Sequence, residues 1–171
     1  SVNLIGKIVD GKSFTVDIDY QLLTNDSIYT KFTTGKYPIL DYQASQFVVK
    51  RVLSDDGVGG KKNNSYKYAG GKVNVQGRGF RGFSEVQVTD DASGIKQMRY
   101  YLNDDDSWKY ISSPLYKSLV VLPNGIVTSQ TDNSNGLKIF YNGKSHFSYT
   151  RTSVSQNFEV DGSFVDKTFT N

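Results

Sequence analysis

The stretch that most constrains the fold is residues 66–102, because it switches repeatedly between strand-like alternation and turn residues. Apolar and polar residues alternate around 66–68, 73–75 and 86–88, which is the period of a strand with two different faces. Between the second and third of these lies the sequence GRGFRGF, whose three glycines favour a bend or the close approach of another strand. The stretch predicts a strand, a glycine-rich corner, a second strand, an acidic turn and a third strand.

This stretch contains the residues that we expect to shape the fold. Phe80 and Phe83 of the corner are predicted to pack against the part of the chain that the bend covers. Gly94 is suited to a positive φ in the acidic turn. The predicted structural motif consists of Tyr66, Tyr68, Gly77, Arg78, Gly79, Phe80, Gly82, Phe83, Asp90 and Gly94.

The rest of the chain also predicts antiparallel β-structure. Only three alanines occur beside 12 Tyr and 10 Phe, a composition that favours strands over helices. Turn residues recur along the chain and predict hairpins around 10–13, 123–125 and 161–162, with further turns at 133–136 and 142–143. Residues 21–44 keep no period and are predicted to cross a sheet irregularly. We therefore predict an all-β fold of antiparallel hairpins in a twisted, extended sheet.

Length, charge and cysteine content restrict the class of protein. We expect residues 1–171 to form a single β domain, and its abrupt, strand-like start without a signal peptide suggests a fragment of a much larger chain. The net charge of +3 comes from well-mixed signs, which gives no nucleic-acid footprint. There is no cysteine, and the longest aliphatic run, residues 119–122, is too short to insert into a membrane.

No catalytic, cofactor or metal site is predicted. His146 is the single histidine and lacks a nucleophile motif around it. The acidic runs 90–91 and 104–106 are typical of solvated turns and lack the spacing of an EF-hand. The glycine-rich corner is followed by a strand instead of the helix that a phosphate loop requires. Nucleic-acid binding has only weak support, from Arg78, Arg81, Lys96 and Arg99.

The central stretch resembles a known signature. The run YKYAGGKVNVQGRGFRGFSEVQVTDDASG is similar to the pattern Y-x-Y-x-G-x-K, x-G-R-G-x-x-G-F, T-D, x-G of the B component of bacterial Tc insecticidal toxin complexes. Related plasmid-virulence proteins and Rhs/YD-repeat shell proteins share this pattern. The flanks also resemble the family, with Asn25 where Asp is usual and Ser148 where Pro is usual. The resemblance covers nearly all of residues 20–170.

The resemblance implies a structural role. The chain would be a segment of a Rhs/YD-type β-shell that helps to enclose a toxic effector before delivery, and it would not be an enzyme. Its partners would be other shell segments of the same chain and a C-component-like protein. It would be made in the bacterial cytoplasm and act outside the cell, as part of a secreted virulence complex. The alternative is a free-standing β-sandwich that binds carbohydrates or a receptor through its tyrosines.

Overall fold

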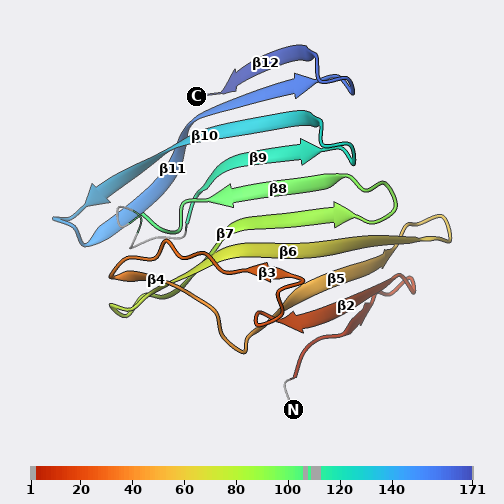
Figure 1. Cartoon of the computed structure of the whole chain (residues 1–171), viewed down its shortest axis with the longest axis horizontal. Coiled ribbons are helices and arrows are strands. Elements are labelled where there is room, and N and C mark those ends of the chain that lie inside the picture. The colour runs from red at the N-terminus through yellow and green to blue at the C-terminus, as the bar shows by residue number, and fades with distance from the viewer. Residues whose placement is uncertain (1–2, 106–107, 109–112, 171) are drawn as a thin grey trace.

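The computed structural model describes residues 3–105, 108 and 113–170, and its strands form one sheet. The strands lie side by side in the order β1-β2-β5-β6-β7-β8-β9-β10-β11-β12, with β3 and β4 paired to β6 (Figure 1). No helix in the described part of the chain is long and apolar enough to cross a membrane. The strands are β1 (Lys7–Val9), β2 (Thr15–Leu22), β3 (Tyr29–Thr30), β4 (Ile39–Asp41), β5 (Phe47–Asp55), β6 (Lys61–Asn74), β7 (Gly79–Asp90), β8 (Lys96–Tyr101), β9 (Leu115–Val121), β10 (Val127–Phe140), β11 (Ser145–Phe158) and β12 (Phe164–Thr170).

The all-β prediction is confirmed, and so are most of the predicted hairpins. Antiparallel ladders join β1 to β2, β9 to β10 and β11 to β12 across the turns that the sequence indicated. The turn between β9 and β10 has Gly125 at φ +89°, and the turn between β11 and β12 has Gly162 at φ +86°. Glycine adopts such φ values without the steric cost that a Cβ imposes. Local turn chemistry therefore sets most of this topology.

The segment between β2 and β5 contains two short strands that the sequence did not predict. β3 runs parallel to β6, with Tyr29 opposite Tyr68, and β4 runs antiparallel to it, with Asp41 opposite Lys72. β5 pairs only with the first part of β6, up to Ser65. The remaining edge of β6 is therefore taken by the two short strands, which fix the irregular segment to the sheet.

The turn predicted at residues 133–136 is wrong. These residues lie inside β10, where the register with β11 shifts between Ser134 and Asn135. Asn135 Nδ2 donates to Leu115 O at 3.0 Å, so this side chain supports the sheet. Gly136 is paired with Tyr149, and a Cβ on it would lie 2.5 Å from that ring. The glycine makes room for a cross-strand aromatic side chain and does not turn the chain.

The core is small and lies at one end of the sheet. Leu23, Ile28 and Tyr29 are buried, and Tyr42, Val48, Tyr68 and Phe83 pack against them. A β-sandwich would bury one face of each sheet against the other, but all described strands belong to a single sheet. The sandwich expected of the alternative function is therefore wrong. Asp106, the last residue of the acidic run 104–106, lies outside the described residues.

Candidate functional site: the buried polar corner of β6 and β7

The polar corner lies where β6 and β7 bend together. Gly70 has φ +63° and Gly82 has φ +85°, and the register between the strands shifts between Gly71 and Val73. A left-handed residue interrupts the regular ladder, so nearby backbone N–H and C=O groups need other hydrogen-bond partners. At this corner several of those partners are buried side chains.

Asn103 is the centre of the first group of contacts. Its side chain is fully buried, and Nδ2 donates to Gly70 O at 2.9 Å and to Gly82 O at 3.0 Å. Ser84 Oγ donates to Asn103 Oδ1 at 2.8 Å and lies 3.0 Å from Gly70 O. One amide thus links the two left-handed glycines, and it satisfies carbonyl groups that the bend would otherwise leave unpaired. The sequence predicted an acidic turn here and did not identify Asn103 as buried.

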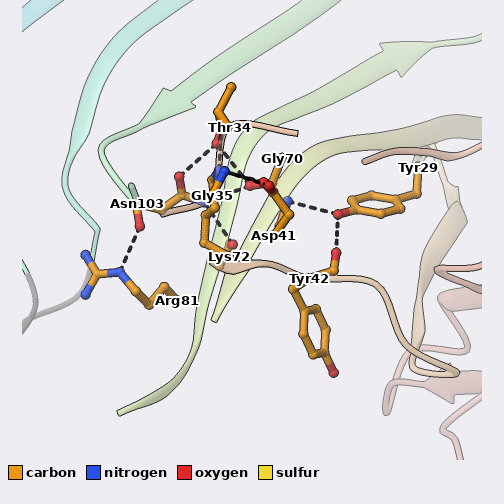
Figure 2. Close-up of polar contacts among 12 residues, drawn as sticks. Tyr29, Thr34, Gly35, Asp41, Tyr42, Gly70, Lys72, Arg81 and Asn103 are labelled. Carbon is orange, nitrogen blue, oxygen red and sulfur yellow. Dashed lines mark hydrogen bonds and ion pairs between the residues drawn. The ribbon is translucent and has the colours of Figure 1, made fainter. Parts of the chain in front are cut away.

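Arg81 holds the loop that follows β8. Its Nε donates to Asn103 O at 2.8 Å (Figure 2). Its Nη1 donates to Trp108 O at 3.3 Å. Ser113 Oγ donates in turn to Arg81 O at 2.8 Å. The Arg81 side chain is only 9% exposed, so its guanidinium is directed at backbone carbonyls. Arg81 is therefore not exposed for the phosphate contact that nucleic-acid binding through this residue would need.

Lys72 and Asp41 form the second group of contacts, across the β4–β6 pair. Lys72 is fully buried, and its Nζ donates to Asp41 Oδ1 and to Thr34 Oγ1, each at 2.7 Å (Figure 2). Asp41 Oδ2 accepts from Gly35 N at 2.6 Å. Burial opposes ionisation of Asp41, but the bonds from Lys72 and Gly35 outweigh it and lower the pKa of this carboxyl. The ion pair is thus satisfied within the fold and ties residues 34–41 to β6.

Aromatic side chains complete the corner. Tyr29 Oη donates to Tyr42 O and accepts from Gly71 N at 3.1 Å. Phe83 packs on Tyr68 with ring centroids 4.7 Å apart and on Tyr29 at 6.0 Å, and Phe80 lies 5.3 Å from Phe83. Burial raises the pKa of Tyr29 and raises that of Tyr68 to about 12, so both phenols stay neutral at physiological pH.

The structure spreads the predicted motif over the corner and its two flanking turns. Gly77, Gly79 and Gly82 all have positive φ, and Arg78 lies exposed in the turn between β6 and β7. Asp90 closes the next turn by accepting from Ala92 N at 3.0 Å, and Gly94 there has φ +70°. Tyr66 lies farther along β6, opposite Val88. The motif residues that reach the buried cluster are Tyr68, Phe80, Gly82 and Phe83.

Sequence reasoning missed the polar residues that hold the corner together. Lys72, Tyr29 and Asp41 lie within the stretches that resemble the family pattern, but the pattern alone assigns them no role. Asn103 gave no signal, because it precedes an acidic run that is typical of a solvated turn. Their contacts join segments far apart in sequence, as when β4 brings Asp41 to Lys72 and the loop after β8 brings Asn103 to Gly70.

The corner has the chemistry of a structural site. Its polar groups bond to backbone atoms or to each other, and within the described residues no cluster of three or more His, Asp or Glu could hold a metal ion. His146 lies in β11, opposite Ile139, and β8, β9 and β10 separate that strand from β7. Asp91 accepts from Asn63 Nδ2 at 2.6 Å and from Ser65 Oγ at 2.8 Å, so it supports the neighbouring strand.

The fold and the corner together define a class: a single-layer, mainly antiparallel β-sheet braced at one end by buried hydrogen bonds. Residues 1–109 match the family described as the insecticide toxin TcdB middle/N-terminal region. This match covers β1 to β8 and all of the polar corner except Ser113, and it spans more than half of the chain. The chain therefore belongs to this toxin family. Among proteins with curated functions, none matches it.

Proposed function

We propose that this chain is a wall segment of a shell in which a toxin complex encloses its effector. The observation that supports this most directly is the amount of exposed surface. The chain exposes 10544 Å². A compact folded chain of 19.1 kDa would expose about 8,400 Å². The excess of about 2,100 Å² is comparable to the total area buried in a large specific interface.

A wall explains where this surface lies. Each strand from β8 to β11 has a strand on both sides, and all described strands belong to one sheet, so no second sheet among the described residues covers either face of these strands. The edge strand β12 is exposed along its whole length. An exposed edge is a ready site for pairing with another strand. Other segments of the same polypeptide and a C-component-like protein are the partners that would extend the sheet and close it.

The proposal includes the wider role that family membership supports. The segment is non-enzymatic, residues 1–171 act as a single β domain within a larger polypeptide, and the shell leaves the producing bacterium as part of a virulence complex. Tyr29, Tyr42 and Tyr68 belong to the core cluster, so these three rings are not available for the exposed stacking surface that a carbohydrate-binding module would use.

Protease protection tests the proposal. The complete protein is purified with its partner and an effector segment, and digestion of the effector is followed by mass spectrometry. We expect the effector to resist digestion in the complex and to be degraded when released by denaturant. Equal digestion in the complex and in the free state would overturn the proposed shell. The variant Lys67→Met, at an exposed position of β6, serves as a control that should leave protection unchanged.

A further inference from the structure

The two faces of the sheet can be assigned from the strand register. Residues directly opposite each other on paired strands share a face, and the next residue along each strand belongs to the other face. Two neighbouring rows cross the sheet from β6 to β12 and define its two faces. One row is Tyr66, Val88, Gln97, Val120, Ser129, Asn157 and Asp166; the other is Lys67, Gln87, Met98, Leu119, Gln130, Gln156 and Lys167.

The face that contains Lys67, here called the charged face, holds most of the charged residues of the paired strands. Salt bridges join Lys7 to Asp17, Arg51 to Asp19, Lys61 to Asp55 and Lys117 to Asp132, all between residues of this face. The charged residues placed here by register are Lys7, Asp17, Asp19, Arg51, Asp55, Lys61, Lys67, Glu85, Lys96, Lys117, Asp132 and Lys167.

The opposite face, which contains Tyr66 and is here called the uncharged face, has a different composition. Where the ladders from β9 to β12 are regular, it presents short polar residues and one valine: Ser118, Val120, Ser129, Thr131, Asn133, Ser153, Ser155, Asn157, Thr168 and Thr170, with Asp166 on β12. From β2 to β7 it presents mainly Val16, Ile18, Val52, Tyr66, Val86 and Val88. Side-chain contacts agree with this assignment, since Thr131 Oγ1 and Ser155 Oγ lie 3.1 Å apart.

Charges on the uncharged face are few, and most lie at its margin. Lys62 and Asp90 sit beside turns, and Asp166 is on the edge strand, where it accepts from Asn157 Nδ2 at 2.8 Å. Arg99 lies in the interior of this face, and Lys50 and Arg151 lie at the register shifts of β5 and β11, where the alternation of faces is interrupted. The asymmetry extends across the sheet and therefore distinguishes the two sides of the wall as a whole.

We propose that the uncharged face is turned inward, against the enclosed polypeptide, and the charged face outward. An enclosed chain displaces water from the wall that it touches, and taking a charged side chain out of water costs free energy unless a partner compensates it. The uncharged face loses least from such contact. The short hydroxyl and amide side chains of this face also carry no charge that would hold a segment of the enclosed polypeptide. Weak attachment is an advantage because the enclosed polypeptide, the cargo of the shell, has to be released. This inference rests on the proposed function.

Single cysteines on adjacent residues test the orientation, because this chain has no cysteine of its own. Ser155→Cys places a thiol on the uncharged face and Gln156→Cys places one on the charged face of the same strand. Thr131→Cys and Gln130→Cys form a second pair on β10 in case one variant does not assemble. The complete protein, assembled with its partner and effector, is treated with a large maleimide–polyethylene glycol, and modification of each peptide is measured by mass spectrometry.

We expect the large reagent to modify Gln156→Cys at least about tenfold faster than Ser155→Cys in the intact complex. The reason is that the reagent can reach a thiol inside the shell only when the shell opens transiently. After denaturation both should react equally. A small maleimide should reach Ser155→Cys in complexes assembled without effector and react more slowly when the effector is present.

Each other result has a separate meaning. Faster modification of Ser155→Cys would show a shell with the opposite orientation and overturn this inference alone. Rapid modification of both variants would overturn the shell itself. Protection of Ser155→Cys from the small reagent even without effector would show that another protein segment, and not cargo, covers the uncharged face, which would also overturn the inference.

Discussion

The buried ion pair between Lys72 and Asp41 should respond unequally to removal of each partner. Asp41→Asn keeps the shape of the side chain and an oxygen acceptor, but it removes the charge that compensates a fully buried ammonium. Breaking a buried pair in this way costs about 3–5 kcal/mol. That is a large fraction of the roughly 5–15 kcal/mol by which a typical domain is stable.

Lys72→Met should cost less. The Asp41 side chain is 14% exposed and keeps its bond from Gly35 N at 2.6 Å, so the remaining carboxylate is partly solvated and partly satisfied. We expect a loss of about 2–3 kcal/mol, near the cost of leaving a buried group unsatisfied. The double variant should be destabilised by about 1–3 kcal/mol less than the sum of the single losses, because the second change removes the unpaired group.

Urea unfolding measures these free energies. Trp108 is the single tryptophan and is 8% exposed beside Arg81, so its fluorescence reports on the corner directly. Lys67→Met, also on β6 but exposed, is the matched control and should change stability by less than about 0.5 kcal/mol. Equal midpoints and slopes for Asp41→Asn and Lys67→Met would refute the structural role of the pair, as would full additivity in the double variant.

Three further outcomes follow from the same structure. Gly70→Ala should destabilise the chain more than Gly79→Ala in thermal melts. Both glycines have positive φ, but only at Gly70 would an added Cβ lie 2.5 Å from Phe32 and Ser84. Equal melting temperatures for the two variants would contradict this. The isolated chain should self-associate in light scattering through β12, and Val165→Lys should reduce the association; a monomer at all concentrations would contradict it. Hydrogen bonds from Lys61 and Thr15 lower the pKa of Asp55 to about 2 in the folded chain. The ionised Asp55 therefore stabilises the fold fully above the pKa of about 3.9 that an aspartate has in an unfolded chain, and this contribution is lost as pH falls toward 2. As pH is lowered over that range, the Asp55→Asn variant should therefore lose less stability than the native chain. Parallel curves of stability against pH for the two proteins would count against a stabilising contact of Asp55 with Lys61 and Thr15.

Local sequence was sufficient for the parts of the fold that depend on neighbouring residues. Period-two alternation identified the strands, and the glycines of the 123–125 and 161–162 turns identified their hairpins, since both signals act within a few residues. The same reasoning failed at residues 133–136, where two asparagines and a glycine are typical of a turn. There Asn135 bonds to β9 and Gly136 accommodates Tyr149, and both constraints come from neighbouring strands.

The candidate site was less predictable, because alternation distinguishes two faces but not what covers them. Lys67 and Lys72 lie on the same strand, five residues apart, yet Lys67 is exposed and Lys72 is fully buried. The difference arises from β4, about 30 residues earlier in the chain, which replaces β5 on the edge of β6 and brings Asp41 opposite Lys72. No pattern within β6 could indicate that change of neighbour.

The glycine-rich corner and the buried polar cluster are best understood as one feature. Left-handed glycines at positions 70 and 82 let β6 and β7 bend together, but the bend takes backbone groups out of the ladder. Tyr29 accepts from Gly71 N, and Asn103 donates to the carbonyls of Gly70 and Gly82. Because an unpaired buried backbone group costs about as much as a lost hydrogen bond, the bend persists only where such side chains reach it. A one-layer sheet has little core to fix its shape, so these side-chain hydrogen bonds are what hold β6 and β7 in their bent arrangement.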